Sequence, residues 1–167
     1  MTESVFAKVP EDAETLLAQQ AVLRELLTRG GILAEAAGVS NDQCEALYQL
    51  GYGFYAQARY SEAFQIFSLL VSYNHLEARY LTALAGAAQM LGRYPDAVQH
   101  YATAAMLLLD DPAPLIHAAE CCLAMERPAE AAEGLRMALE IIDQEPQHEP
   151  LRDRVDALLA PLAAAGH

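Results

Sequence analysis

The sequence YSEA at residues 60–63 returns as YPDA at residues 94–97 and as PAEA at residues 128–131. Each copy begins 34 residues after the previous one, and the closing alanine keeps the same register in all of them. Self-similarity at a fixed period of this length indicates stacked copies of one supersecondary unit. Because one such unit cannot bury its own apolar face, neighbouring copies must pack on one another to form a core.

Further positions follow the same 34-residue step without any insertion. An aromatic residue stands at the start of two copies, and alanine follows it three residues later, which together with a small residue upstream is the tetratricopeptide pattern of paired antiparallel helices. We therefore expect an all-α tetratricopeptide-repeat solenoid of three helix pairs. The small positions are Gly51, Ala85 and Ala119, the large ones Phe67, Tyr101 and Leu135, and the alanines Ala63, Ala97 and Ala131.

The segments on either side of the repeats lack the 34-residue pattern, so the sequence predicts that the chain has three parts. Residues 1–39 form an N-terminal helical arm or cap, residues 40–143 hold the three repeats, and residues 144–167 form a linker and a C-terminal capping helix. Gly92 is the expected C-cap of a repeat helix. Pro161 is expected to shorten the capping helix.

The N-terminal arm is amphipathic, and its role stays open between two interpretations. It covers the exposed end of the solenoid, as end repeats require, or it serves as a dimerisation arm that makes a homodimer. The leucines that share roughly one side of this helix are Leu16, Leu23, Leu26 and Leu27.

Composition and charge exclude several classes of protein. The formal net charge is −13, and a field of that sign repels phosphate backbones and anionic lipid, so we expect no nucleic-acid partner. No run of 18 apolar residues occurs, so neither a membrane span nor a signal peptide is expected. Three cysteines, two of them adjacent, favour a reducing compartment, and hence the cytoplasm.

No group of residues predicts catalysis or metal binding. His117 and Cys121 lie four residues apart on one expected helix, which would supply half of a metal site, but no second pair follows at ligand spacing. The favoured interpretation is a packed histidine and a buried thiol. We expect no catalytic residue, no metal and no cofactor, which makes an enzyme the least favoured class.

A tyrosine cluster points instead to peptide binding. Tyr48, Tyr52 and Tyr55 share one face of the first repeat helix, away from the packing face that holds Leu47 and Leu50. On a stacked solenoid that face lines the concave surface, and such a groove suits an extended peptide. Alternatively, these rings pack under the N-terminal helix. The complete candidate set is Tyr48, Tyr52, Tyr55, Arg79, Tyr80, Thr82, Gly86, Gln89, Ile116 and Glu120.

These residues resemble a known family. YQLGYGFY at 48–55, RYSEA at 59–63, LLVSYNH at 69–75, ARY at 78–80 and HAAEC at 117–121 are similar to the signatures of the class II chaperones of bacterial type III secretion. The likeness covers well over half of the chain. Glu126 departs from it, because many members carry glycine there.

The resemblance implies a function. Members of the family bind hydrophobic translocator proteins in the bacterial cytoplasm before export and hold a short Pro/Leu-containing segment in the concave groove. They are often dimeric through the N-terminal helices, and some act with a transcription activator. The alternative reading of the residues is a generic tetratricopeptide adaptor, or a structural subunit, that docks another peptide.

Overall fold

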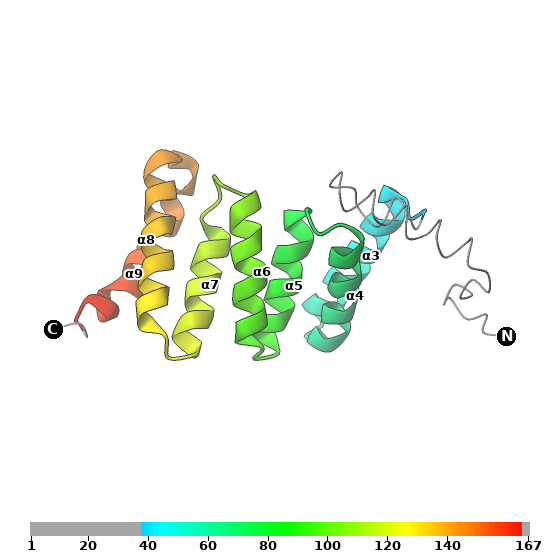
Figure 1. The fold of residues 1–167 in the computed structure, drawn as a ribbon, viewed down its shortest axis with the longest axis horizontal. Helices are drawn as coiled ribbons and strands as arrows, with labels where there is room; N and C mark the ends of the chain where they lie inside the picture. The colour runs from blue at the N-terminus through cyan, green and yellow to red at the C-terminus, as the bar shows by residue number, and fades with distance from the viewer. Residues whose placement is uncertain (1–37, 165–167) are drawn as a thin grey trace, which may run out of the picture. The chain divides into compact units, whose positions relative to one another are not determined.

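The computed structural model describes residues 38–164, and all regular secondary structure in that range is helical (Figure 1). The chain divides into two compact units, Met1–Ser40 and Asn41–His167, and every described helix belongs to the second. The N-terminal arm lies outside the described residues, and so do its four leucines, Leu16, Leu23, Leu26 and Leu27. The two interpretations of the arm therefore stay predictions.

Helices of the second unit stand side by side in a row, each packed against the next in sequence (Figure 1). Three helix pairs make the repeats, and a 3-10 helix and a last α-helix follow them. This arrangement confirms the predicted all-α tetratricopeptide-repeat solenoid. The elements are α3 (Asn41–Ala56), α4 (Tyr60–Tyr73), α5 (Ala78–Met90), α6 (Tyr94–Leu107), α7 (Ala113–Ala124), α8 (Pro128–Gln144), η1 (Pro146–Leu151) and α9 (Arg152–Ala164).

The turn inside each helix pair has the same backbone geometry. Ala58, Gly92 and Glu126, spaced by 34 residues, have positive φ angles of 58°, 71° and 58°. The following residue donates its backbone N–H to the carbonyl five residues earlier, and for Arg127 and Cys122 this distance is 2.9 Å. This hydrogen bond across a left-handed residue is the Schellman termination of a helix. Gly92 meets the geometry at little cost, whereas alanine and glutamate do not.

An arginine follows each of these left-handed residues and ties the turn to the next helix. The guanidinium group pairs with a carboxylate three residues later, in the first turn of the second helix of the pair, where negative charge is favoured. Arg59 also lies over the Phe54 ring at 4.4 Å, and Arg93 lies over Phe64 at 4.3 Å. The three ion pairs are Arg59–Glu62, Arg93–Asp96 and Arg127–Glu130.

Small residues let the helices of a pair approach closely. A Cβ atom at Gly51 would lie 2.7 Å from a carbon of the Phe67 ring, a distance that real Cβ contacts do not show. Ala85 and Ala119 occupy the matching positions and are buried. The repeat alanines of the second helices are likewise completely buried, at Ala63, Ala97 and Ala131.

One residue expected on the packing face is exposed. Leu50 keeps 48% of its surface accessible, whereas its counterpart Leu84 keeps 3%. The reason is position in the row, because α5 has described helices on both sides and no described helix precedes α3. The leucine pattern alone cannot distinguish an end helix from an inner one.

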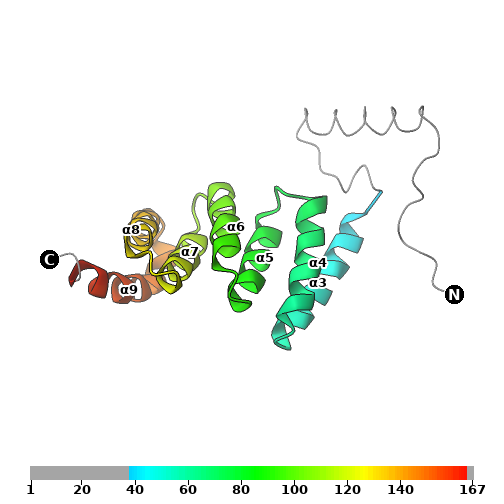
Figure 2. The same cartoon turned by 60° about the horizontal axis from the view of Figure 1, so that its bottom comes forward.

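The C-terminal segment covers the last repeat. Val155 of α9 is completely buried in one apolar cluster with Leu135 and Ile142 of α8. Figure 2 shows α9 beside α7 and α8 at the C-terminal end of the row. The expectation that Pro161 shortens this helix is wrong, because α9 continues to Ala164 and a proline in its last turn removes only one backbone hydrogen bond. Among the described helices, none is both long and apolar enough to cross a bilayer.

The positive φ of Glu126 leads to a stability prediction. Glu126→Gly should raise the free energy of unfolding by about 1 kcal/mol, because glycine adopts the left-handed conformation without the steric cost of a Cβ atom. Urea denaturation of the two proteins measures the difference. Glu126→Gln is the control that removes the charge and keeps the Cβ atom, and an equal gain in this control would show that charge, not backbone geometry, is responsible.

Candidate functional site

A cavity of about 490 Å³ opens along the first helices of the repeats. Most of its lining comes from α3, α5 and α7, the helices that the sequence pattern assigned to the concave surface. The second helices α4 and α6 supply one aromatic ring each. The lining residues are Tyr48, Tyr52, Tyr55, Phe67, Arg79, Thr82, Ala83, Gly86, Gln89, Met90, Tyr101, His117 and Glu120.

All sequence-predicted groove residues except two lie in this lining. Tyr80 and Ile116 are the exceptions, with only 5% and 1% of their surface exposed. Tyr80 is the residue after Arg79 on α5, so its side chain leaves the helix in a different direction. Its ring packs against Tyr48, with the ring centroids 5.8 Å apart. Ile116 belongs to the apolar cluster that contains Val155 of α9, so the capping helix covers a position that is open in the first two repeats.

Five lining residues were not among the candidates: Phe67, Ala83, Met90, Tyr101 and His117. Phe67 and Tyr101 had been assigned to the core as large repeat residues. They are indeed buried, yet both also line the cavity. His117 could have been found, because it lies three residues before Glu120 on the same helix.

The tyrosines form the apolar end of the cavity. Tyr48 stacks at a tilt on Phe67, with centroids 5.8 Å apart, and the Arg79 guanidinium lies 4.5 Å from the Tyr48 ring. Burial raises the pKa of the Tyr48 hydroxyl, so the ring is neutral at physiological pH. Tyr52 keeps 58% of its surface exposed and is open to a ligand. The alternative prediction, that an N-terminal helix packs over these rings, concerns residues outside the described range.

Gly86 leaves free space at the middle of the cavity. A Cβ atom there would lie 3.6 Å from the Tyr101 hydroxyl and 3.7 Å from the Tyr55 hydroxyl, both ordinary contact distances. In contrast to Gly51, no close packing requires this glycine. Any larger side chain would extend into the space between the two hydroxyl groups and narrow the cavity.

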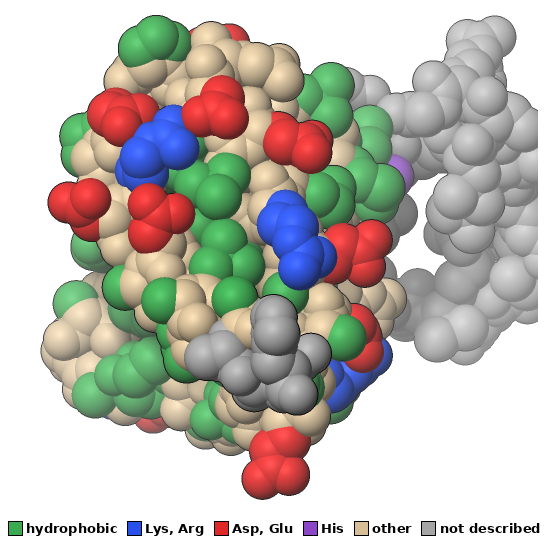
Figure 3. Space-filling view, turned by 90° about the vertical axis from the view of Figure 1, so that its left-hand side faces the viewer, with side chains coloured by type: hydrophobic (Ala, Val, Ile, Leu, Met, Phe, Trp, Pro, Cys, Tyr) green, Lys and Arg blue, Asp and Glu red, His purple; other side chains and the backbone are tan. Residues whose placement is uncertain are grey.

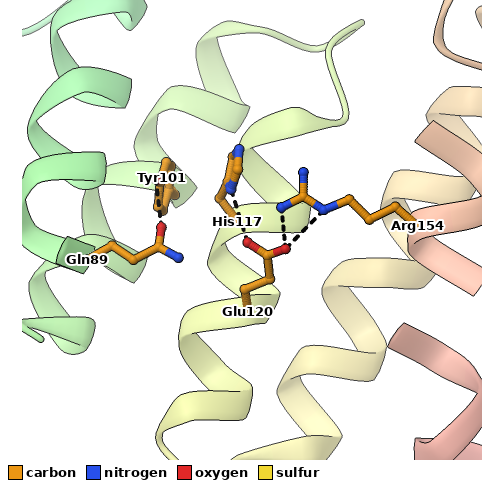
Figure 4. A network of polar contacts seen from close by, with 5 residues as sticks. All are labelled: Gln89, Tyr101, His117, Glu120 and Arg154. Carbon is orange, nitrogen blue, oxygen red and sulfur yellow. Dashed lines mark hydrogen bonds and ion pairs between the residues drawn. The ribbon is translucent and has the colours of Figure 1, made fainter. Parts of the chain in front are cut away.

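A polar network forms the other end of the cavity (Figure 4). The Tyr101 hydroxyl donates to Oε1 of Gln89 at 2.9 Å, and the Tyr101 ring stacks on His117 with centroids 5.4 Å apart. His117 Nδ1 lies 3.1 Å from Oε2 of Glu120. Arg154 of α9 donates through Nε to Oε1 of the same carboxylate at 3.0 Å. The network therefore connects α5, α6, α7 and α9.

The charged groups of the cavity are paired within the protein. Arg79 reaches Glu45 at 2.9 Å, and Glu120 is held by Arg154. The hydrogen bond from His117, together with Arg154, lowers the pKa of the Glu120 carboxyl although the group is half-buried. A ligand therefore meets aromatic and apolar surface without an unpaired charge.

Nothing in the described part of the chain brings together three side chains that could hold a metal ion. Cys121 is completely buried, and burial raises the pKa of its thiol to about 11, so the nucleophilic thiolate is disfavoured. His117, four residues away, lines the cavity.

One face outside the cavity carries more acidic than basic side chains. Figure 3 shows acidic side chains among apolar ones at the C-terminal end of the helix row, with few basic groups. The net charge of −13 agrees with this face. A surface of this charge repels polyanions.

Comparison with known proteins identifies the family. The chain is 32% identical over 140 residues to the low calcium response locus protein H of Yersinia pseudotuberculosis, a match that covers 84% of this chain and 83% of the relative. The structure of the type III secretion translocator chaperone SycD of Yersinia enterocolitica matches with a TM-score of 0.73 and 31% identity, over 77% of this chain and 98% of SycD. The chain belongs to the translocator chaperones of type III secretion.

Solved relatives of this chaperone include complexes. The SycD structure contains a peptide of the translocator YopD. PcrH of Pseudomonas aeruginosa, solved with the chaperone-binding region of PopD, is 34% identical to this chaperone, with a TM-score of 0.74 over 78% of this chain and 98% of PcrH. No family model matches the chain. The resemblance stated from the sequence is confirmed by these relatives.

The lowered pKa of Glu120 leads to a prediction on stability. A carboxylate whose folded-state pKa is depressed stabilises the fold above its unfolded pKa and loses that contribution as pH falls. Glu120→Gln should therefore lower the free energy of unfolding at neutral pH, by an amount on the order of 1 kcal/mol, and the difference should shrink as the pH falls below 4.5, the ordinary pKa of a glutamate.

Urea unfolding of the chaperone at several pH values measures this effect. Glu133→Gln, which changes an exposed carboxylate of α8, is the matched control and should leave the curve nearly unchanged. A constant difference between E120Q and the unmodified chain at all pH values would contradict the assignment of the effect to ionisation of Glu120.

Proposed function

We propose that this chaperone holds an extended apolar segment of a hydrophobic type III secretion translocator in the cavity along α3, α5 and α7. The observation that carries the proposal is the combination of an aromatic lining with charges that are already paired. An extended peptide can insert alternate side chains into such a groove. An uncharged segment would lose little hydration energy there, whereas a charged segment would have no free counter-charge.

The dimensions and exposure of the cavity support a peptide ligand. A volume of about 490 Å³ accommodates a few side chains, not a folded domain. Tyr52 and Met90 are both about half exposed at its edge, so apolar surface is available before any ligand binds. Burial of such rings by a partner side chain supplies most of the binding free energy at typical interfaces.

The relatives support the choice of partner. SycD has been solved with a peptide of the translocator YopD, and PcrH with the chaperone-binding regions of both PopD and PopB. By analogy, this chaperone binds its translocator before export, in the bacterial cytoplasm. Binding lowers the concentration of free partner, and with it aggregation and premature assembly. The chaperone acts through binding alone, without a catalytic step.

A homodimer formed through the N-terminal leucines and a transcription-activator partner remain predictions from the family resemblance. The residues that would form the dimer lie outside the described range. No feature of the described helices favours a generic adaptor over a translocator chaperone.

Tyr52→Ala tests the proposed function. Fluorescence anisotropy with labelled peptides of the chaperone-binding regions of PopD and PopB measures affinity, and thermal unfolding measures stability. We expect the substitution to weaken peptide binding about tenfold, because an exposed aromatic anchor is lost. The melting temperature should hardly change, since the ring is mostly exposed.

Tyr73→Ala, on α4 and outside the cavity lining, is the matched tyrosine control and should retain full affinity. A marked fall in the melting temperature of Y52A alongside the loss of affinity would show that the ring belongs to the core. No binding of either peptide by the unmodified chaperone would remove support for the proposed partner class.

Gly86→Ala gives a second test, in which stability should increase while peptide affinity decreases. The added methyl group should raise the free energy of unfolding by about 0.5–1 kcal/mol, because alanine favours a helix interior over glycine. It should weaken peptide binding about fivefold, because it occupies space that a ligand side chain needs. Gly53→Ala, where a Cβ atom meets open space outside the cavity lining, is the control. It should give the same stability gain with unchanged affinity, and undiminished affinity in G86A would contradict the prediction.

A further inference from the structure

The polar network at one end of the cavity includes the Gln89 amide. Its Oε1 accepts from the Tyr101 hydroxyl, so its Nε2 is left as a donor. No hydrogen bond within the described residues uses that Nε2. In the same range, no half-buried residue has a side-chain nitrogen or oxygen that is both buried and unpaired. The Gln89 Nε2 atom is therefore accessible from the cavity or from solvent.

The same network fixes the tautomer of His117. Its Nδ1 faces Oε2 of Glu120, and an ionised carboxylate can only accept a hydrogen bond. Nδ1 therefore carries the hydrogen, and Nε2 of the neutral imidazole is an acceptor. A third of the His117 side chain is exposed, and stacking on Tyr101 holds the plane of the ring.

Arg154 contacts this network from outside the repeats. It binds Oε1 of Glu120 through both Nε and a terminal nitrogen, which leaves Oε2 for His117 (Figure 4). Glu120 would otherwise be free to rotate, because a glutamate side chain has three rotatable bonds. Two charge-assisted hydrogen bonds from one guanidinium to the same oxygen, with His117 on the other oxygen, restrict the carboxylate. The helix α9 thus contacts the cavity-lining Glu120 with one side chain while its apolar face covers the core.

We propose that Gln89 Nε2 and His117 Nε2 form a donor and acceptor pair for the main chain of the bound segment, and that Arg154 is the positioning residue that sets the acceptor through Glu120. The proposal rests on the proposed function, because it concerns the same cavity. It adds a contact that does not depend on the ligand's side chains.

Main-chain recognition follows from the chemistry of an extended ligand. Each residue of an extended peptide presents one N–H and one C=O group, and leaving either unpaired in an apolar cavity is costly. Among the other polar side chains of the lining, the Thr82 hydroxyl donates to the Ala78 carbonyl and Arg79 is paired with Glu45. Gln89 and His117 offer the complementary donor and acceptor on neighbouring first helices.

Arg154→Met tests the proposal and keeps the aliphatic part of the side chain. Arg152→Met is a matched control on the same helix, because Arg152 pairs with Asp143 and Glu149 and not with the network. Affinity is measured by fluorescence anisotropy with the chaperone-binding region of PopD. We expect R154M to bind about fivefold more weakly than the unmodified chain and R152M to bind equally well. Thermal unfolding checks that both variants are folded.

Two readouts separate positioning from a general structural effect. Long-range ¹H–¹⁵N correlation spectra report which nitrogen of His117 carries the hydrogen, and the Nδ1–H form should dominate in the unmodified chain but not in R154M. A series of probe peptides, each with one amide replaced by an ester, removes the N–H groups one at a time. One position should cost the unmodified chain about fivefold and cost R154M almost nothing.

The outcomes are distinct. Three results would each overturn the main-chain pair. The first is an Nε2–H tautomer of His117 in the unmodified chain, and the second is equal peptide affinity of R154M and the unmodified chain. The third is an ester substitution that weakens binding to R154M as much as it weakens binding to the unmodified chain. Loss of affinity in R152M as large as in R154M would overturn the specific role of Arg154. Failure of the unmodified chain to bind any probe peptide would overturn the proposed function, and the main-chain pair with it, even if the tautomer were the expected one.

Discussion

Close approach of paired helices is the constraint on which the rest of this structure depends. Gly51, Ala85 and Ala119 leave room for the large residue of the facing helix, and the same spacing of 34 residues places a left-handed turn after each first helix. With the two helices held this near, the opposite face of the first helix is directed away from the core. The cavity is the result of repeating this geometry, because its lining comes mainly from those free faces.

Much of the fold could be predicted because its cause is periodic. A fixed step in the sequence corresponds to a fixed step in space, so the 34-residue period predicted the helix pairs. The spacing of the tyrosines within the first helix predicted that they share one face. The arginines at 59, 93 and 127 have the same period, and their turn contacts could also have been found. The packing face of α3 was misjudged at Leu50, because an end helix lacks the neighbour that an inner helix has.

The site was less predictable where the repeat stops. Ile116 has the position of a cavity residue but is buried, because α9 covers that part of α7. Arg154 reaches Glu120 from a helix that follows the 3-10 segment η1, and the sequence does not determine the direction that the chain takes after that segment. Contacts between a repeat and a non-repeated cap depend on this direction, so their residues carry no period that could reveal them.

The exposed Tyr52 ring and Met90 thioether at the cavity have a consequence for the chaperone itself. Tyr52, Met90 and Leu50 are exposed, so the chaperone itself carries the kind of apolar surface that it would cover in a partner protein. The excess of carboxylates makes copies of the chaperone repel one another, which opposes their self-association. Because dissolved ions screen that repulsion, the colloidal behaviour of the unloaded protein should be more sensitive to salt than that of the loaded one.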